Sequence, residues 1–157
     1  MKAIFLDIDG VLVTRRTLKE RSGMRSVADP KCVYALNFLL RTSGAVLVVS
    51  SSWRFCGLNE LQAIFDYWKV SFPIHGLTPD LTRKDGALYI GVPRGQEIQA
   101  YLDANPEIKQ FVILDDECDM AHLEADLLRT TFDDGLTEDI AHQAISKLNA
   151  RNPFCDR

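Results

Sequence analysis

One stretch near the start of the chain decides its fold: AIFLDIDGVL, at residues 3–12. Its first four residues form a short, continuous apolar run, which is typical of a strand buried in a parallel sheet. Asp7 and Asp9 follow this run, and α/β sheets bind their ligands at the carboxyl ends of strands. Because a buried carboxylate without a partner is costly, we expect a positive group beside this pair.

The same stretch has a second interpretation, which is a tight β-hairpin. An Asp-Gly pair between two apolar runs, here Asp9-Gly10, is typical of a two-residue type I′ turn. A later stretch argues for the buried strand instead: FVILDD, at residues 111–116, is also an apolar run that ends in two acids. Two acidic strand ends favour a shared ligand site.

These strand ends predict a metal site. If the two strands are neighbours, the second pair, Asp115 and Asp116, converges on the first pair and the carboxylates repel one another. A divalent cation relieves this repulsion, and hard oxygen ligands without His or Cys favour Mg²⁺. The alternative is that Asp115 or Asp116 only caps a helix, which we expect at residues 120–126.

Length and composition indicate one soluble globular domain. The chain has 157 residues, of which 46% are hydrophobic and 25% charged, enough to bury a sizeable core. We expect the domain over residues 1–150 and a C-terminal tail over 151–157. Asp7 and Asp9 interrupt the apolar run that a signal peptide needs, and no stretch is long enough for a membrane-spanning helix. Four scattered cysteines indicate reduced thiols in a cytoplasmic protein.

Positive charge is concentrated in residues 14–31, which we call the basic segment. Six basic and two acidic residues give this segment +4, which leaves −8 for the rest of a chain with a net charge of −4. Such a segment would attract a polyanion. The alternative is a solvated loop without a partner. The charged residues are Arg15, Arg16, Lys19, Arg21, Arg25 and Lys31 against Glu20 and Asp29.

Strand and helix signals alternate along the chain, which predicts a parallel sheet covered on both faces. The clearest helix begins at Pro30, carries an apolar stripe and ends at Gly44. The further expected strands lie at 45–49, 70–74, 111–116 and 127–132, and the further expected helices at 59–68, at 95–103 and from Thr137 onward.

Three serines end the second strand: Ser50, Ser51 and Ser52. Hydroxyls and free backbone N–H groups at a strand–helix junction predict an oxyanion site. The alternative is ordinary turn chemistry and helix capping. Arg54, a few residues on, either makes a bidentate phosphate contact or lies in solvent.

Arg94 stands just before Gly95 and an expected helix, near the positive end of the helix dipole, where a cation is disfavoured. A base placed there needs an anionic partner, which the carboxylates and a substrate phosphate would supply. The alternative is a surface arginine that bends into solvent. Lys84 is the reserve candidate for the same role.

Four motifs in this order resemble those of the haloacid dehalogenase (HAD) superfamily of phosphatases. The resemblance covers residues 2–135 and rests on DIDGVL at 7–12, VVSS at 48–51, Arg94-Gly95 and ILDD at 113–116. More narrowly, the chain resembles the HAD domain associated with Swiss Army Knife RNA repair proteins, in SSSWR at 50–54, GLTP at 76–79, RGQEI at 94–98 and GLT at 135–137. Arginine replaces the usual lysine of the third motif, which keeps the charge but changes its geometry.

The resemblance implies a three-layer, Rossmann-like α/β fold whose parallel sheet has the order 5-4-1-2-3. It implies that Asp7 is the nucleophile, which forms an aspartyl-phosphate, and that Asp9 acts as acid and then as base. It implies Mg²⁺ bound by Asp7, the backbone carbonyl of Asp9, and Asp115, with Asp116 beside them. The other implied residues are Ser50 and Arg94 as catalytic groups, and Gly10, Ser51, Ser52 and Arg54 as substrate-binding groups.

Members of the superfamily often carry a cap domain, but the intervals 13–29 and 75–93 are too short for a folded cap. The resemblance therefore implies an open site, as in relatives that act on large substrates. With the basic segment, this predicts a Mg²⁺-dependent phosphomonoester hydrolase that acts on the terminal phosphate of an RNA or DNA end, with no membrane partner. Two alternatives stay open: a phosphatase of small phosphometabolites or nucleotides, and a non-catalytic HAD-like binding protein.

Overall fold

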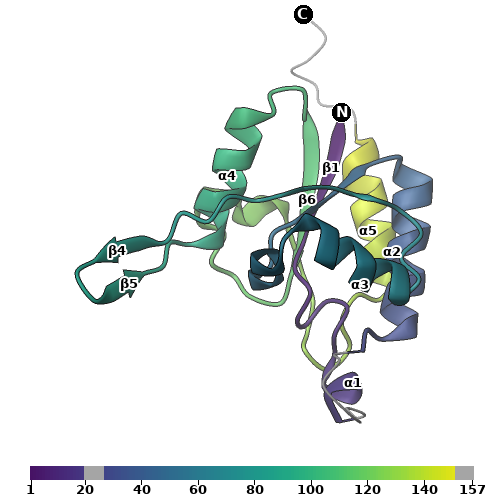
Figure 1. The fold of residues 1–157 in the computed structure, drawn as a ribbon. Coiled ribbons are helices and arrows are strands. Elements are labelled where there is room, and N and C mark those ends of the chain that lie inside the picture. Colours follow the sequence, from purple (N-terminus) through teal and green to yellow (C-terminus); the bar gives the residue numbers. More distant parts are fainter. Residues whose placement is uncertain (20–26, 151–157) are drawn as a thin grey trace, which may run out of the picture.

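A five-stranded parallel sheet forms the centre of the fold (Figure 1). The computed structural model describes residues 1–19 and 27–150. Across the sheet the order is β3-β2-β1-β6-β7, and every neighbouring pair is parallel. Read from β7 and counted along the chain, this is the order 5-4-1-2-3, which confirms the prediction. The strands are β1 (Lys2–Leu6), β2 (Val46–Val49), β3 (Ile74–Leu77), β6 (Gln110–Asp115) and β7 (Leu127–Arg129).

Helices cover both faces of this sheet, as expected for a three-layer α/β fold (Figure 1). Alternate side chains of β1 show the two cores: Ile4 and Leu6 pack among residues of α2, α3 and α5, whereas Ala3 and Phe5 pack among residues of α4 and η2. The helices are α2 (Pro30–Ser43), α3 (Leu58–Tyr67), α4 (Arg94–Ala104) and α5 (Glu138–Asn149), with the 3₁₀ helices η1 (Ser52–Cys56) and η2 (Ala121–Asp126).

Strand register brings the carboxyl ends of β1, β2 and β6 to one level. Leu6 lies opposite Val49 on β2 and Leu114 on β6. The backbone continues this register by one residue, since Ser50 N donates to Leu6 O at 2.9 Å and Asp7 N donates to Leu114 O at 3.0 Å. Asp7, Ser50 and Asp115, which follow these three positions, therefore lie at the same edge of the sheet. This register excludes the hairpin interpretation, because β1 has a parallel partner on both sides.

The helix predicted from Pro30 to Gly44 is confirmed. Asp29 is its N-cap and accepts a hydrogen bond from Lys31 N at 3.0 Å, and Pro30 occupies the first turn, where no N–H is needed. Gly44 ends the helix in the left-handed conformation, with φ of 64°. Its apolar stripe is buried against the sheet and against α5.

The strand predicted at residues 70–74 is wrong in position, because β3 begins only at Ile74. Val70 N donates to Phe65 O at 2.9 Å, which continues the turn after α3, and Pro73 has no N–H for a sheet. Val70 is nevertheless buried and belongs to the core, so its apolar character indicated burial and not a strand. The strand predicted at 127–132 ends at Arg129, and the helix expected at 120–126 is the 3₁₀ helix η2.

The interval at residues 75–93 carries a small antiparallel hairpin and no large cap. Its strands β4 (Arg83–Asp85) and β5 (Leu88–Ile90) project from the body of the molecule (Figure 1). All six of their residues are exposed. The other interval, 13–29, contains the short helix α1 (Arg15–Lys19), and residues 20–26 lie outside the described part.

Two further expectations concern the chain as a whole. Within residues 1–19 and 27–150, no helix has the length and apolar character needed to cross a membrane. Cys32, Cys56 and Cys118 are free thiols, and Cys155 lies with the expected tail 151–157 outside the described residues.

Candidate active site

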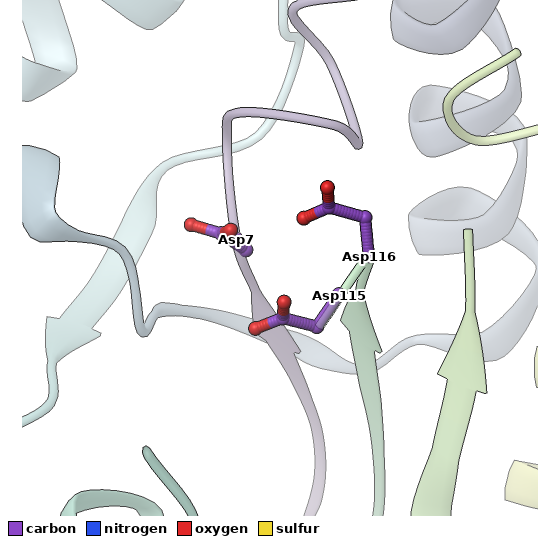
Figure 2. A group of neighbouring side chains, drawn as sticks. All are labelled: Asp7, Asp115 and Asp116. Atoms are coloured by element: carbon purple, nitrogen blue, oxygen red, sulfur yellow. The ribbon is translucent and has the colours of Figure 1, made fainter. Parts of the chain in front are cut away.

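Three carboxylates meet at the carboxyl ends of β1 and β6. One oxygen each of Asp7, Asp115 and Asp116 lies within 4.8 Å of the other two (Figure 2). Asp7 is 5% exposed and Asp115 is fully buried, so two of these charges are held away from water. The structure thus brings together the acidic strand ends, which lie far apart in the sequence.

Gly10 allows the loop after β1 to approach the acidic cluster. Its φ is +75°, and a Cβ at this position would lie 2.3 Å from Cγ of Asp116. The positive φ favours glycine, and the short distance to Asp116 leaves no space for a Cβ. Thr130 Oγ1 donates to Gly10 O at 2.7 Å and ties this loop to the segment after β7.

Charge repulsion and burial act together on the cluster. Burial, followed by the negative charge of Asp7, raises the pKa of Asp115 to about 7, although the charge of Arg94 opposes the rise. The pKa of Asp116 is raised as well, first by burial and then by Asp7. The site therefore holds more negative charge than its protein surroundings stabilise near neutral pH.

Arg94 supplies the positive group predicted beside the carboxylates. Its Nη1 lies 3.0 Å from Asp7 Oδ1 and its Nε lies 3.3 Å from Asp115 Oδ2. Burial lowers the pKa of Arg94, but the carboxylates of Asp7 and Asp115 outweigh this effect and raise it overall. Since only 17% of its side chain is exposed, the alternative of a solvent-facing arginine is excluded.

The loop after β6 fixes the start of α4, and this places Arg94 beside the acidic cluster. Asp119 Oδ2 accepts from Arg94 N at 3.0 Å, and Asp119 O accepts from Gly95 N at 3.2 Å. A Cβ on Gly95 would lie 2.0 Å from Met120 O, so this close approach requires glycine. Asp119 therefore accepts from the first two N–H groups of α4, whose N-cap is Pro93, while Asp115 and Asp116 do not cap η2, whose N-cap is Met120.

The acidic cluster fits a hard divalent cation. Its donors are carboxylate oxygens only, the set that Mg²⁺ prefers. Oδ2 of Asp115 is buried without a hydrogen-bond partner and lies 3.3 Å from Arg94 Nε, so a cation would complete its coordination. The Asp9 carboxylate is directed elsewhere, because Trp53 Nε1 donates to its Oδ2 at 2.8 Å. A role for Asp9 through its backbone carbonyl stays a prediction.

The three serines have different environments. Ser50 is fully buried, and its Oγ has no hydrogen-bond partner, which is typical of a hydroxyl that binds a ligand. Its backbone O accepts from Arg94 Nη1. Ser51 is the N-cap of η1, where its Oγ accepts from Trp53 N at 3.4 Å, and Ser52 is exposed. Capping therefore explains Ser51, and Ser50 alone of the three has an unpaired buried hydroxyl.

Arg54 is neither in solvent nor beside the acidic cluster. Its side chain is 9% exposed, and its Nη2 donates to Glu97 Oε1 at 2.7 Å. Its Nη1 donates to Ser51 O at 3.3 Å, and its Nε is buried without a partner. Lys84 is not brought to the cluster either, because it lies on β4 with its Nζ 5.6 Å from the ring centroid of Tyr89.

The basic segment is partly neutralised by its own surroundings. Arg15 pairs with Asp133, and Arg16 pairs with Asp29, the buried N-cap of α2. Arg21, Arg25 and Glu20, with the side chain of Lys19, lie outside the described residues. Attraction of a polyanion to this segment stays a prediction.

Sequence reasoning missed three residues that shape the site: Trp53, Glu97 and Asp119. Each acts across the fold, on Asp9, on Arg54 and on the backbone of Arg94 respectively. Two of them stand inside motifs that carried the resemblance, SSSWR and RGQEI, and this is the signal that could have found them. Their partners follow from tertiary packing alone.

A parallel sheet of this order, with a carboxylate cluster at the ends of β1 and β6 and an arginine aimed into it, defines a Rossmann-like domain of the HAD type. The family described as the HAD domain in Swiss Army Knife RNA repair proteins matches residues 3–141, so the chain belongs to this family. The search of curated proteins finds no match.

Proposed function

We propose that this protein is a Mg²⁺-dependent phosphomonoester hydrolase that uses Asp7 as its nucleophile. The observation that carries the proposal is the cluster of Asp7 and Asp115, both buried, with the half-buried Asp116, to which Arg94 adds a single positive charge. HAD proteins generally use Mg²⁺. Asp7, Asp115, Asp116 and the Asp9 carbonyl would hold the ion, which masks negative charge so that a carboxylate can approach a phosphate.

Asp7 and Asp9 act in both steps of the proposed reaction. Asp7 attacks phosphorus, and the bond to the leaving oxygen breaks while Asp9 supplies that oxygen with a proton. Water then attacks the aspartyl-phosphate, gives its proton to Asp9 and releases phosphate and the Asp7 carboxylate. The unpaired Ser50 hydroxyl and the Arg94 guanidinium stabilise the charge on the transferred oxygens.

For the substrate, we propose the terminal phosphate of an RNA or DNA end. The absence of a large cap within the described residues leaves room for a substrate larger than a metabolite, and the family is named for RNA repair proteins. The positive charge of the basic segment would add attraction for the polyanion. A small phosphometabolite or nucleotide is the second candidate, favoured by the ion pairs that already occupy Arg15 and Arg16.

Hydrolysis of 4-nitrophenyl phosphate with and without Mg²⁺ tests the chemistry. We expect turnover that needs Mg²⁺ and is lost in Asp7→Asn, while Asp66→Asn, which alters an exposed carboxylate on α3, stays active. If the wild-type protein and Asp7→Asn are equally inert at high enzyme concentration, the protein is a non-catalytic binding domain.

A panel of end-phosphorylated oligonucleotides and mononucleotides tests the substrate class. We expect kcat/KM to favour the oligonucleotides, and to fall as salt rises because phosphate contacts release counterions. Preference for a mononucleotide or a sugar phosphate over every oligonucleotide would contradict this assignment and favour the second candidate.

A further inference from the structure

Trp53 makes a directed contact with the proposed acid and base. The indole Nε1 donates to Oδ2 of Asp9 at 2.8 Å, and the other oxygen, Oδ1, has no hydrogen-bond partner among the described residues. Asp9 is half-buried, and its backbone forms a bridge with Val13 in the turn after β1. The contact joins residues that are far apart in sequence, the loop after β1 and the turn after β2.

The indole of Trp53 is anchored by its backbone and by a neighbouring ring. Trp53 N donates to Ser51 Oγ at 3.4 Å, which places the residue in the first turn of η1. Its ring packs edge to face on Trp68, with the ring centroids 5.5 Å apart, and Trp68 in turn stacks on Phe65 at 5.8 Å. Phe65 is fully buried in the core. The N–H donor therefore belongs to an aromatic cluster that is anchored in the core, and this anchors the donor that contacts the Asp9 carboxyl group.

We propose that Trp53 is a positioning residue that holds Asp9 by Oδ2 and presents Oδ1 to the leaving-group oxygen. This inference rests on the proposed function, in which Asp9 is the proton donor of the first step. The indole N–H needs an acceptor, and in a protonated carboxyl group the better acceptor is the carbonyl oxygen. An acceptor at Oδ2 thus leaves the transferable proton at Oδ1.

The chemistry gives this role a specific consequence. As the bond between phosphorus and the leaving oxygen breaks, the proton passes from Asp9 Oδ1 to that oxygen and leaves a carboxylate that still accepts from Trp53. A basic leaving group, such as an alkoxide, needs this proton. A stable leaving group, such as 4-nitrophenolate, departs without it. Loss of the indole donor therefore affects the two substrates unequally.

The test is Trp53→Phe, assayed with an alkyl phosphate and with 4-nitrophenyl phosphate. Phenylalanine keeps an aromatic ring against Trp68 and removes the donor. We expect kcat/KM for the alkyl phosphate, which reports the first step without the later hydrolysis of the aspartyl-phosphate, to fall about 10- to 100-fold, because Asp9 stays in place and only part of the contribution of a general acid is lost. With 4-nitrophenyl phosphate we expect less than about a 3-fold change, since that step gains little from an acid.

Trp68→Phe is the matched control, because it alters the same aromatic cluster and leaves in place Trp53, whose indole donates to Asp9. We expect this variant to affect both substrates equally. A second variant replaces Trp53 with benzothienylalanine, in which sulfur takes the place of the indole N–H and the shape is kept. It should reproduce the selective loss even if Trp53→Phe folds poorly.

A readout without turnover completes the test. The chain has two tryptophans, so nitrogen-15 labelling gives two indole N–H signals, and the Trp53 signal is the one lost in Trp53→Phe. We expect Asp9→Asn to shift that signal and to leave the Trp68 signal in place. Equal losses on both substrates, or no shift of the Trp53 signal, would overturn the positioning role. A wild-type protein that hydrolyses neither phosphate would instead overturn the proposed function.

Discussion

Gly10 is the residue at which the backbone and the acidic cluster constrain each other most closely. Alanine there must adopt a φ of +75° and also displace the Asp116 carboxylate. We expect Gly10→Ala to lower the free energy of unfolding by about 2–4 kcal/mol, because both costs add. Urea denaturation in the absence of Mg²⁺ measures this.

Gly44→Ala is the matched control for Gly10→Ala. Gly44 has a similar φ of +64°, but a Cβ there meets nothing within 4 Å. We expect this variant to lose only the backbone contribution, about 1–2 kcal/mol. Equal losses in the two variants would show that Asp116 moves aside without cost.

Asp115 makes the stability of the metal-free protein depend on pH. Its pKa is raised to about 7 by burial and by Asp7, so between about pH 4 and 7 the folded protein binds a proton that the unfolded chain has released. The contribution of Asp115 to the free energy of unfolding is therefore greatest at low pH and is lost as pH rises through 7. Thermal unfolding in EDTA at pH 5, 6, 7 and 8 measures the slope.

Asp115→Asn should flatten this profile, because the amide does not titrate. At pH 8 we expect the metal-free variant to be at least as stable as the wild-type protein, since a buried, repelled charge is gone. A wild-type protein that grows steadily more stable from pH 5 to 8 would contradict the assignment.

At the scale of elements, η1 and α4 are joined by one buried ion pair. Arg54 and Glu97 have side chains only 9% and 7% exposed, and Glu97 Oε1 also accepts from Leu81 N at 3.2 Å, ahead of the β4–β5 hairpin. We expect Glu97→Gln to lower the free energy of unfolding by about 2 kcal/mol, because it removes a charge-assisted hydrogen bond but keeps an acceptor. Urea denaturation monitored by circular dichroism measures the change.

Asp80→Asn provides the control for Glu97→Gln. Asp80 lies 3.9 Å from the same guanidinium, but its side chain is 42% exposed. Water screens such a pair, so we expect no measurable change in the denaturation midpoint. A loss as large as that of Glu97→Gln would show that Arg54 depends on both acids.

An element can be predicted from the sequence when the residues that determine it are neighbours in the chain. The helix over Pro30–Ser43 was predicted within a residue, because its cap, its proline and its terminal glycine are all contiguous signals. The strand expected at 70–74 was misplaced, because Val70 is buried without entering the sheet. Asp7 and Asp115 were predicted to meet because acids that end buried strands can meet at only one edge of a parallel sheet. Contacts such as Trp53 with Asp9 depend on side-chain packing between separate turns, which no local pattern encodes.

At the scale of the whole molecule, the cluster predicts a coupling between Mg²⁺ and stability. An ion that binds only the folded protein raises the free energy of unfolding by about 2.7 kcal/mol at a concentration 100 times its dissociation constant. We expect the melting temperature to rise with Mg²⁺, and to rise more at pH 8 than at pH 5, because protonated carboxyls ligate poorly.

Asp7→Asn and Asp115→Asn separate specific binding from a general salt effect. Both variants should lose most of the Mg²⁺ response, whereas Asp66→Asn, altered on the exposed surface of α3, should keep it. An equal response to Mg²⁺ in all four proteins would place the ion elsewhere.

The position of β1 in the sheet has a consequence for how the protein is made. This central strand pairs with β6, and Lys2 lies opposite Gln110, so the pairing closes a very long loop. Such pairing forms late, because chain entropy must be lost before any contact is gained. A nascent chain that has reached β2 but not residue 110 therefore leaves the β6 side of the apolar strand KAIFL unpaired. Yield in the cell should depend on chaperones that shield this edge, even when the finished domain is stable.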